Sequence, residues 1–93
     1  MASFDLEELI PDLVYSLQAP GSDEFANVSP EEWISRLRDG FWSAFNDGLL
    51  QGYIESDGVV NPRTGTTTIP RDQQQVVLLY TAINVLRQTL LRI

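Results

Sequence analysis

The stretch from Asp72 to Ile93, DQQQVVLLYTAINVLRQTLLRI, decides the fold of this chain because it predicts a helix with two apolar faces. At 3.6 residues per turn, a large apolar set lines one face and a smaller ridge lies roughly opposite. The large set is Val76, Leu79, Tyr80, Ile83, Leu86 and Leu90, and the second ridge is Leu78, Ala82 and Val85. A 93-residue chain has few elements to cover both faces. We therefore expect the large set in the core and the second ridge at a subunit contact.

A second long helix is predicted over about residues 30–51. Ser29 can cap it, Pro30 fits the first helical position, and Glu32 can complete a capping box. The residues on its apolar side are Ile34, Leu37, Phe41, Ala44, Phe45, Gly48 and Leu49, with Trp33 at the margin. Gly40 and Gly48 weaken a helix, which indicates either close approach of another backbone or simple tolerance. Gly52 is the expected terminator.

Two further segments complete the predicted fold. Apolar residues at spacings of three and four predict a helix over about 4–18, in which Pro11 either bends the element at Ile10 or lies in its first regular turn. Asp57-Gly58 predicts a tight turn, so we expect a hairpin or three-stranded ribbon over about 53–69, ending in Thr66 to Ile69. The last helix covers about 70–92. Residues 1–93 are thus expected to form one mainly α domain, a small bundle of three or four helices with a short β-hairpin excursion between the two longest.

The composition removes most catalytic chemistry. The chain contains no cysteine, histidine or lysine, so thiolate metal sites, an imidazole base and a Schiff-base amine are all missing. Adjacent acids such as Glu7 and Glu8 point about 100° apart on a helix and do not form an acid/base pair. Glu55, Asp57 and Asn61 could approach one another, but turn formation explains them better than a metal site. We expect no enzyme activity, no catalytic residue, no metal and no cofactor.

The net charge of −7 is concentrated in the first third of the chain, where the acids precede the first basic residue, Arg36. Such a surface disfavours binding along nucleic acid, which needs clustered Lys or Arg. An acidic solvated surface is the plain interpretation, and docking of this face on a basic partner is the alternative. No run of about 18 apolar residues occurs, and the N-terminus is acidic where a signal peptide is basic. We expect a protein that is made and used without export or membrane insertion.

The predicted contact residues gather on the second ridge and at exposed aromatic and basic positions. Trp42 and Leu50 lie off the apolar side of the 30–51 helix, where an interface anchor and a structural role are equally supported for Trp42. Arg87 lies within the main apolar face of the last helix, so its guanidinium must snorkel, pair or meet a partner. The predicted subunit or partner interface is Trp42, Leu50, Leu78, Ala82, Val85, Arg87, Leu91 and Ile93. The predicted hairpin contacts are Tyr53, Ile54, Val59, Val60 and Arg63.

Two segments, SPEEWISRLRDGFWSAFNDGLLQGY and RDQQQVVLLYTAINVLRQTLLRI, joined by a glycine and threonine ribbon, resemble a small tailed-bacteriophage head-to-tail connector of the adaptor type. In that family a tryptophan-containing helix is followed by a Gly-Tyr junction, a short excursion and a helix that begins near Asp-Gln-Gln. The matching residues are Trp33, Leu37, Gly52, Tyr53, Asp72, Gln73, Gln74, Leu79, Ile83 and Leu86.

The resemblance implies a mechanical role. Copies of such an adaptor form a homo-oligomeric ring, commonly of twelve subunits, beneath the portal protein, and the ring supplies a docking surface for the stopper or tail-completion protein. DNA passes through the ring without being read or cut. The resemblance also implies a location in the neck of the virion after synthesis in the host cytoplasm. A small acidic helical regulatory or chaperone-like binding protein is the alternative from another class.

Overall fold

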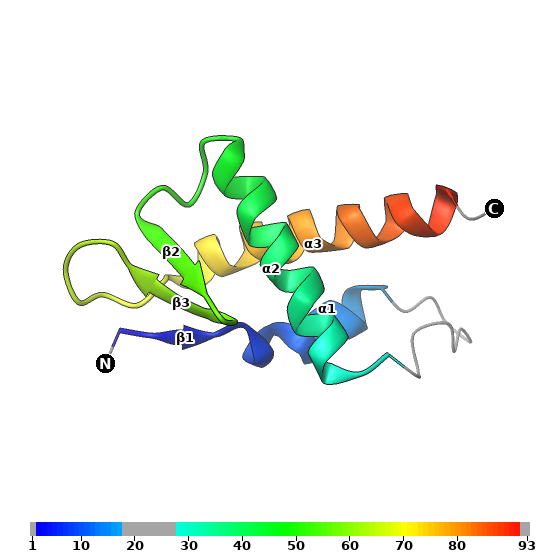
Figure 1. The fold of residues 1–93 in the computed structure, drawn as a ribbon, viewed down its shortest axis with the longest axis horizontal. Helices are drawn as coiled ribbons and strands as arrows, with labels where there is room; N and C mark the ends of the chain where they lie inside the picture. The colour runs from blue at the N-terminus through cyan, green and yellow to red at the C-terminus, as the bar shows by residue number, and fades with distance from the viewer. Residues whose placement is uncertain (1, 18–27, 92–93) are drawn as a thin grey trace.

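The computed structural model describes residues 2–17 and 28–91, and of residues 89–91 it describes the backbone. Along the chain the elements are β1 (Phe4–Asp5), the 3-10 helix η1 (Leu6–Leu9), α1 (Ile10–Leu17), α2 (Pro30–Asn46), β2 (Tyr53–Ser56), β3 (Val59–Pro62) and α3 (Arg71–Leu91). The mainly α fold and the hairpin between the two longest helices are confirmed. Figure 1 shows α2 lying across α3, with the strands gathered at one end of the molecule. The arrangement is looser than a helical bundle, because a small sheet takes the place of further helix packing.

The N-terminal segment follows the alternative that places Pro11 in the first regular turn, and its helix begins later than the predicted residue 4, which lies in β1. A turn of 3-10 helix precedes the α-helix, which begins at Ile10 and holds Pro11 in its first turn. Proline is tolerated there because its missing N–H has no partner inside the helix. Leu6, Leu9, Leu13 and Leu17 are buried at spacings of three and four, so one side of η1 and α1 faces the core.

The helix α2 begins at Pro30 with Ser29 as its cap, as predicted, but it ends earlier than predicted. The Ser29 hydroxyl accepts the N–H of Glu32 at 3.2 Å, and Pro30 opens the helix. The helix ends at Asn46 because Gly48 adopts φ +90°, the left-handed conformation that favours glycine. The N–H of Gly48 donates to Phe45 at 3.0 Å and that of Leu49 donates to Ala44 at 3.0 Å, the hydrogen bonds of a Schellman motif. Gly48 is therefore the terminator, and the prediction of Gly52 in that role was wrong.

The sheet contains a strand that sequence reasoning missed. Asp57 and Gly58 both have positive φ, 57° and 83°, and form the two-residue type I′ turn that joins β2 and β3. The third strand is β1, which pairs antiparallel with β3 through Phe4 and Val60. The segment Thr66 to Ile69 forms no strand, contrary to the prediction. Its last residue, Ile69, is instead buried in the core just before α3 begins.

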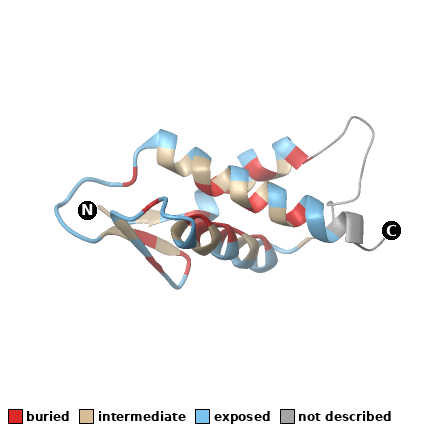
Figure 2. Cartoon of the chain, turned by 90° about the horizontal axis from the view of Figure 1, so that it is seen from above, coloured by how far each residue is buried: buried red, intermediate tan, exposed pale blue. Residues whose placement is uncertain are grey.

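The apolar faces of α3 differ in part from the prediction: Val76 and Tyr80 pack against the core as expected, but the other described members of the large apolar set do not. Val77, Thr81 and Val85 are buried, whereas Leu79, Ile83 and Leu86 are 59%, 44% and 48% exposed. Figure 2 shows this alternation of buried and exposed positions along the helices. The physical reason is the close approach of α2: a methyl group on Gly40 would lie 2.0 Å from Thr81 Oγ1 and 2.9 Å from the Thr81 backbone nitrogen. Only compact side chains fit between backbones this close, so the larger Leu and Ile side chains are turned outward.

Candidate assembly surface

The exposed apolar side of α3 is the first candidate surface. We call it the α3 stripe and define it as Leu79, Ile83 and Leu86, each about half exposed. Aliphatic side chains that line up along one helix in this way are typical of interaction surfaces, whereas single exposed apolar residues are ordinary. The helix presents this stripe because its opposite side is fully used by the core.

Leu79 and Ile83 of the α3 stripe line an open groove, and we call the other, polar residues that line it the polar rim. The groove, of about 540 Å³, lies between the end of α2 and α3, and it is lined by Ser43, Asn46, Asp47, Leu79, Tyr80, Ile83, Asn84 and Arg87. The Asn84 side-chain amide donates to Ser43 Oγ at 3.3 Å across the two helices. The groove thus combines two aliphatic residues with residues that can form hydrogen bonds, a mixture that is common at protein interfaces.

Tyr80 and Asp47 join the two helices at one end of this groove. The Tyr80 hydroxyl donates to Asp47 Oδ2 at 2.8 Å. This hydrogen bond, with partial burial and the negative charge of the carboxylate, raises the pKa of Tyr80 above its ordinary value of 10.0. Asp47 keeps one carboxylate oxygen for another donor, and Arg87 makes no ion pair with any described residue. The rim therefore carries one acid and one base that the described part of the chain does not pair.

A buried carboxylate fixes the hairpin to α2. Glu55 on β2 is 5% exposed; its Oε1 accepts the indole N–H of Trp42 at 2.7 Å, and its Oε2 accepts the N–H of Gly58 at 2.7 Å. Arg38 Nε lies 2.7 Å from the same Oε2. Three donors thus compensate the charge, and every buried side-chain polar atom of the described residues has a partner. Glu55 therefore has a structural role, because its carboxylate is already paired with these three donors within the chain.

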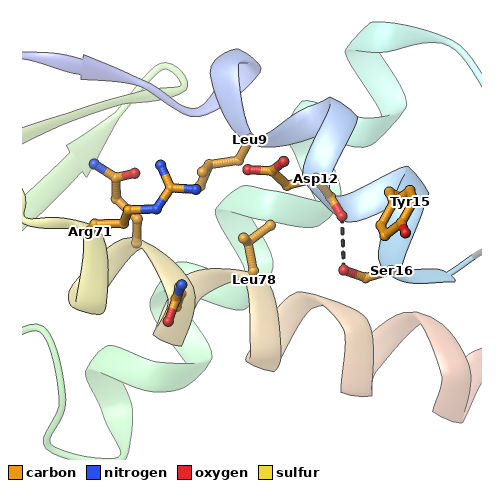
Figure 3. A pocket seen from close by; sticks show the side chains of 8 residues that line it. Leu9, Asp12, Tyr15, Ser16, Arg71 and Leu78 are labelled. Carbon is orange, nitrogen blue, oxygen red and sulfur yellow. Dashed lines mark hydrogen bonds between the residues drawn. The ribbon is translucent and has the colours of Figure 1, made fainter.

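A second groove lies between α1 and the first half of α3. It has a volume of about 340 Å³ and is lined by Leu9, Asp12, Tyr15, Ser16, Arg71, Gln74, Gln75 and Leu78. Figure 3 shows Arg71 reaching from the start of α3 toward Leu9 and Asp12, with Leu78 below them. The Ser16 hydroxyl is occupied by a hydrogen bond to the Asp12 carbonyl at 2.8 Å. The groove is therefore a mixed polar and apolar surface, without a nucleophile and base in contact.

The structure places some of the predicted interface residues in the core and others at the surface. Leu50 and Val85 are buried in the core of their own chain, so the prediction that they contact another subunit was wrong. Leu50 follows α2 with a φ of 58° and is buried, and Val85 lies one helical turn after the buried Thr81 and belongs to the same core. Trp42, Leu78 and Ala82 are half-buried against the core, and their contact with a partner stays a prediction. Arg87 is exposed, whereas Ile93 and the side chain of Leu91 lie outside the described residues.

The predicted hairpin contacts also differ in how far they are buried. Val60 is buried in the core, Tyr53 and Val59 are half-buried, and Ile54 and Arg63 are exposed. Sequence reasoning considered Glu55 only beside Asp57 and Asn61 at the turn, and missed its burial and its contacts with Trp42 and Arg38 of α2. It also placed Leu79, Ile83 and Leu86 in the core, although they form the exposed stripe.

The described residues contain no group of three or more histidine, cysteine, aspartate or glutamate side chains that could hold a metal ion. None of the helices in the described ranges is long and apolar enough to cross a membrane.

Compared with protein-family models, with curated proteins and with solved structures, the chain shows no significant match.

Proposed function

We propose that this chain is a structural subunit of a tailed bacteriophage, the adaptor that forms a ring between the portal protein and the stopper or tail-completion protein. Its task is mechanical: it extends the channel through which DNA leaves the capsid and offers a docking surface on each side. The protein is a component of the virion neck and has no enzymatic activity.

The observation that carries the proposal is the α3 stripe. A chain with one domain buries the apolar side of each helix against its own core when it can, and here the stripe stays outside that core. A second subunit that covers Leu79, Ile83 and Leu86 removes this apolar area from water, which stabilises an assembly. The polar rim with Asp47 and Arg87 then supplies directional contacts beside this apolar area.

The places of the residues that carry the family resemblance support the same role. Trp33 and Leu37 are core residues of α2, and Gly52-Tyr53 leads from α2 into β2. Asp72 and the glutamines after it form the first turn of α3. The aliphatic part of the resemblance, by contrast, is the exposed α3 stripe, where packing within the chain gives no reason for three large apolar residues.

The acidity of the chain fits a DNA channel. The net charge is −7, and the acids of η1, α1 and the first turn of α2 are exposed. A wall that repels phosphate groups does not retain the DNA that must leave the capsid. We therefore expect the assembled ring to bind DNA weakly and without sequence preference.

Co-expression with the portal protein of the same virus tests the proposal. We expect a stable complex that electron microscopy resolves as a ring of about twelve copies on one end of the portal. Replacing Leu79 and Ile83 together by serine should abolish the ring while the monomer keeps its helical circular dichroism. The matched control is Tyr15→Ser, which removes an apolar side chain that is 84% exposed on α1.

Two results would contradict the proposal. One is a chain that binds no portal at any ratio, and the other is a stable one-to-one complex with a protein that is not part of a virion. The second result would support the regulatory or chaperone-like alternative. Loss of the ring in Tyr15→Ser but not in the double serine variant would reject the α3 stripe as the subunit contact.

A further inference from the structure

We infer that, before assembly, the α3 stripe is covered by α3 of a second copy of this chain, packed antiparallel about a two-fold axis beside Ile83. This inference rests on the proposed function in one respect: the pair hides the face that the ring uses, so it must open when the portal is present. The occupant of the stripe, its direction and its register all follow from residues on α3 and at the end of α2.

The spacing of the stripe identifies a helix as the occupant. Leu79, Ile83 and Leu86 follow one another at intervals of four and three residues. In the sequence, Leu90 continues the series by four, and Val76, which is partly buried against the core, precedes it by three. Intervals of this kind keep one seam of a helix facing another helix, whose side chains fill the holes between them. A strand or an irregular peptide does not match this repeat.

The described helices of the chain indicate that the second helix is another α3. The apolar sides of α1 and α2 are already buried, through residues such as Leu13, Leu37 and Phe41. The α3 stripe is exposed with the required spacing, and a second copy brings an identical stripe. A two-fold pair of identical faces is also the simplest closed arrangement, because both copies then bury the same residues.

Charge complementarity sets the direction of the pair. Tyr80 and Arg87 lie seven residues apart on the same flank of α3, a distance of about 10 Å along the helix. The Asp47 carboxylate is held beside Tyr80 by their 2.8 Å hydrogen bond. In an antiparallel pair with its axis beside Ile83, midway between these positions, each Arg87 faces the other copy's Tyr80 and Asp47. Two arginine–carboxylate pairs form at once, whereas a parallel pair sets Arg87 opposite the small Ala82.

Engineered cysteines test the pair directly, because the natural chain contains none. The variants are Ile83→Cys, Leu79→Cys and Leu86→Cys, with Tyr15→Cys as the exposed control on α1. A disulfide needs Cα atoms within about 7 Å, and only a residue next to the two-fold axis meets its own copy at that distance. Under mild oxidation of the purified chain, Ile83→Cys should give a covalent dimer on a non-reducing gel. The other three variants alone should not, but Leu79→Cys mixed with Leu86→Cys should.

The pattern of crosslinks separates the alternatives. Equal crosslinking of all three stripe variants with themselves would mean a parallel pair and would overturn the inferred direction. Absence of a dimer in Ile83→Cys, or crosslinks only between unlike positions in a ladder of sizes, would overturn the two-fold pair. A ring that forms on the portal would then leave the proposed function intact. Conversely, a dimer as expected but no binding to the portal would contradict the proposed function and support the two-fold pair.

Charge reversal provides a second readout. Arg87→Asp alone places two acids in contact and should weaken dimerisation, measured by analytical ultracentrifugation, by about tenfold or more. Asp47→Arg alone should do the same. The double variant exchanges the charges and should restore most of the affinity, whereas a chain in which the two single effects simply add would contradict the Arg87–Asp47 contact. Arg63→Asp, an exposed change on the hairpin side, is the matched control.

Discussion

At the scale of single residues, one hydrogen bond supports the structural role of Trp42 over the interface role that its sequence position also allowed. Its ring packs edge-on against Phe41 and Phe45, with centroids 5.1 Å from each, and its N–H is used by Glu55. An indole whose polar atom is satisfied inside the chain has a structural role irrespective of any partner. The carboxylate of Glu55 thus explains Trp42, Arg38 and the tight turn together.

Replacing Glu55 by glutamine should destabilise the fold by about 1–3 kcal/mol, because the neutral amide has one acceptor oxygen for three donors and turns an N–H₂ group toward one of them. Urea unfolding followed by circular dichroism measures the change. The control is Glu32→Gln, which loses a 3.6 Å ion pair with Arg36 at the surface and should change stability by less than about 1 kcal/mol. Equal effects of the two changes would contradict a stabilising role for the three contacts of the buried Glu55 carboxylate.

Tyr80 should titrate above pH 10.0, because its hydrogen bond to Asp47 favours the protonated phenol. Its pKa is raised in the folded state, so the stability it contributes is fully present below pH 10.0 and is lost as the pH rises through the folded pKa. Spectrophotometric titration of the wild type against Tyr80→Phe identifies its signal. Asp47→Asn should return the pKa toward 10.0, and an unchanged titration in that variant would argue against the contact.

At the scale of secondary-structure elements, the crossing of α2 and α3 decides which residues face inward. Gly40 lets the Thr81 side chain lie against the backbone of α2, and the Thr81 hydroxyl donates to the Val77 carbonyl at 2.7 Å. A buried threonine is thereby compatible with an apolar core. Gly40 thus has a packing reason, so close approach and not tolerance explains it.

Gly40→Ala should destabilise the protein by about 1–3 kcal/mol, although alanine favours helix by up to about 1 kcal/mol. The added methyl group meets the Thr81 backbone as well as its side chain, so Thr81→Ala should rescue the variant only in part. Thermal and urea unfolding of the single and double variants measure this coupling. Gly52→Ala is the control, since nothing lies within 4 Å of its added methyl group, and it should be nearly neutral.

Alanine substitutions along α3 should separate its two faces. Val77→Ala removes methyl groups from the core and should cost about 2 kcal/mol, whereas Ile83→Ala on the exposed stripe should cost less than about 1 kcal/mol in the dissociated monomer. Urea unfolding at low protein concentration gives both values. A larger loss for Ile83→Ala would restore the arrangement expected from the apolar pattern alone.

At the scale of the whole molecule, the chain is long and narrow, with extents of 43 × 24 × 21 Å. The helix α3 runs along the length of the molecule in Figure 1, so the α3 stripe is available along an extended edge. In the proposed assembly, an elongated chain of this kind can contact a neighbour through much of its length, which is advantageous for a small protein whose core is modest.

In the proposed assembly a second chain covers the stripe, so folding and assembly should be linked. The thermal midpoint of the wild type should rise with protein concentration, since association stabilises the folded state by mass action. The variant with serine at Leu79 and Ile83 should have a midpoint independent of concentration. Differential scanning calorimetry over about a hundredfold range of concentration measures both. A constant midpoint in the wild type would show that the free chain does not associate through this face.

Much of the local structure was predictable from the sequence. The Ser29-Pro30 start of α2, the Asp57-Gly58 turn and the start of α3 just after Pro70 all follow rules that act within a few residues. The early end of α2 at Gly48 was missed because two glycines, Gly48 and Gly52, both suit the role. The pairing of β1 with β3 was missed because the two strands are more than fifty residues apart in sequence.

The sequence by itself determined the helices, the hairpin and the presence of two apolar faces on α3, since these depend on residue type and spacing along the chain. Only the tertiary structure decided which face is buried. Periodicity cannot choose between two apolar faces, and the choice depends on steric fit at the contact of Gly40 with Thr81. The same holds for Glu55, whose three donors come from α2 and the hairpin turn. Packing between distant segments therefore places Leu79, Ile83 and Leu86 on the surface, where they are available to a second chain.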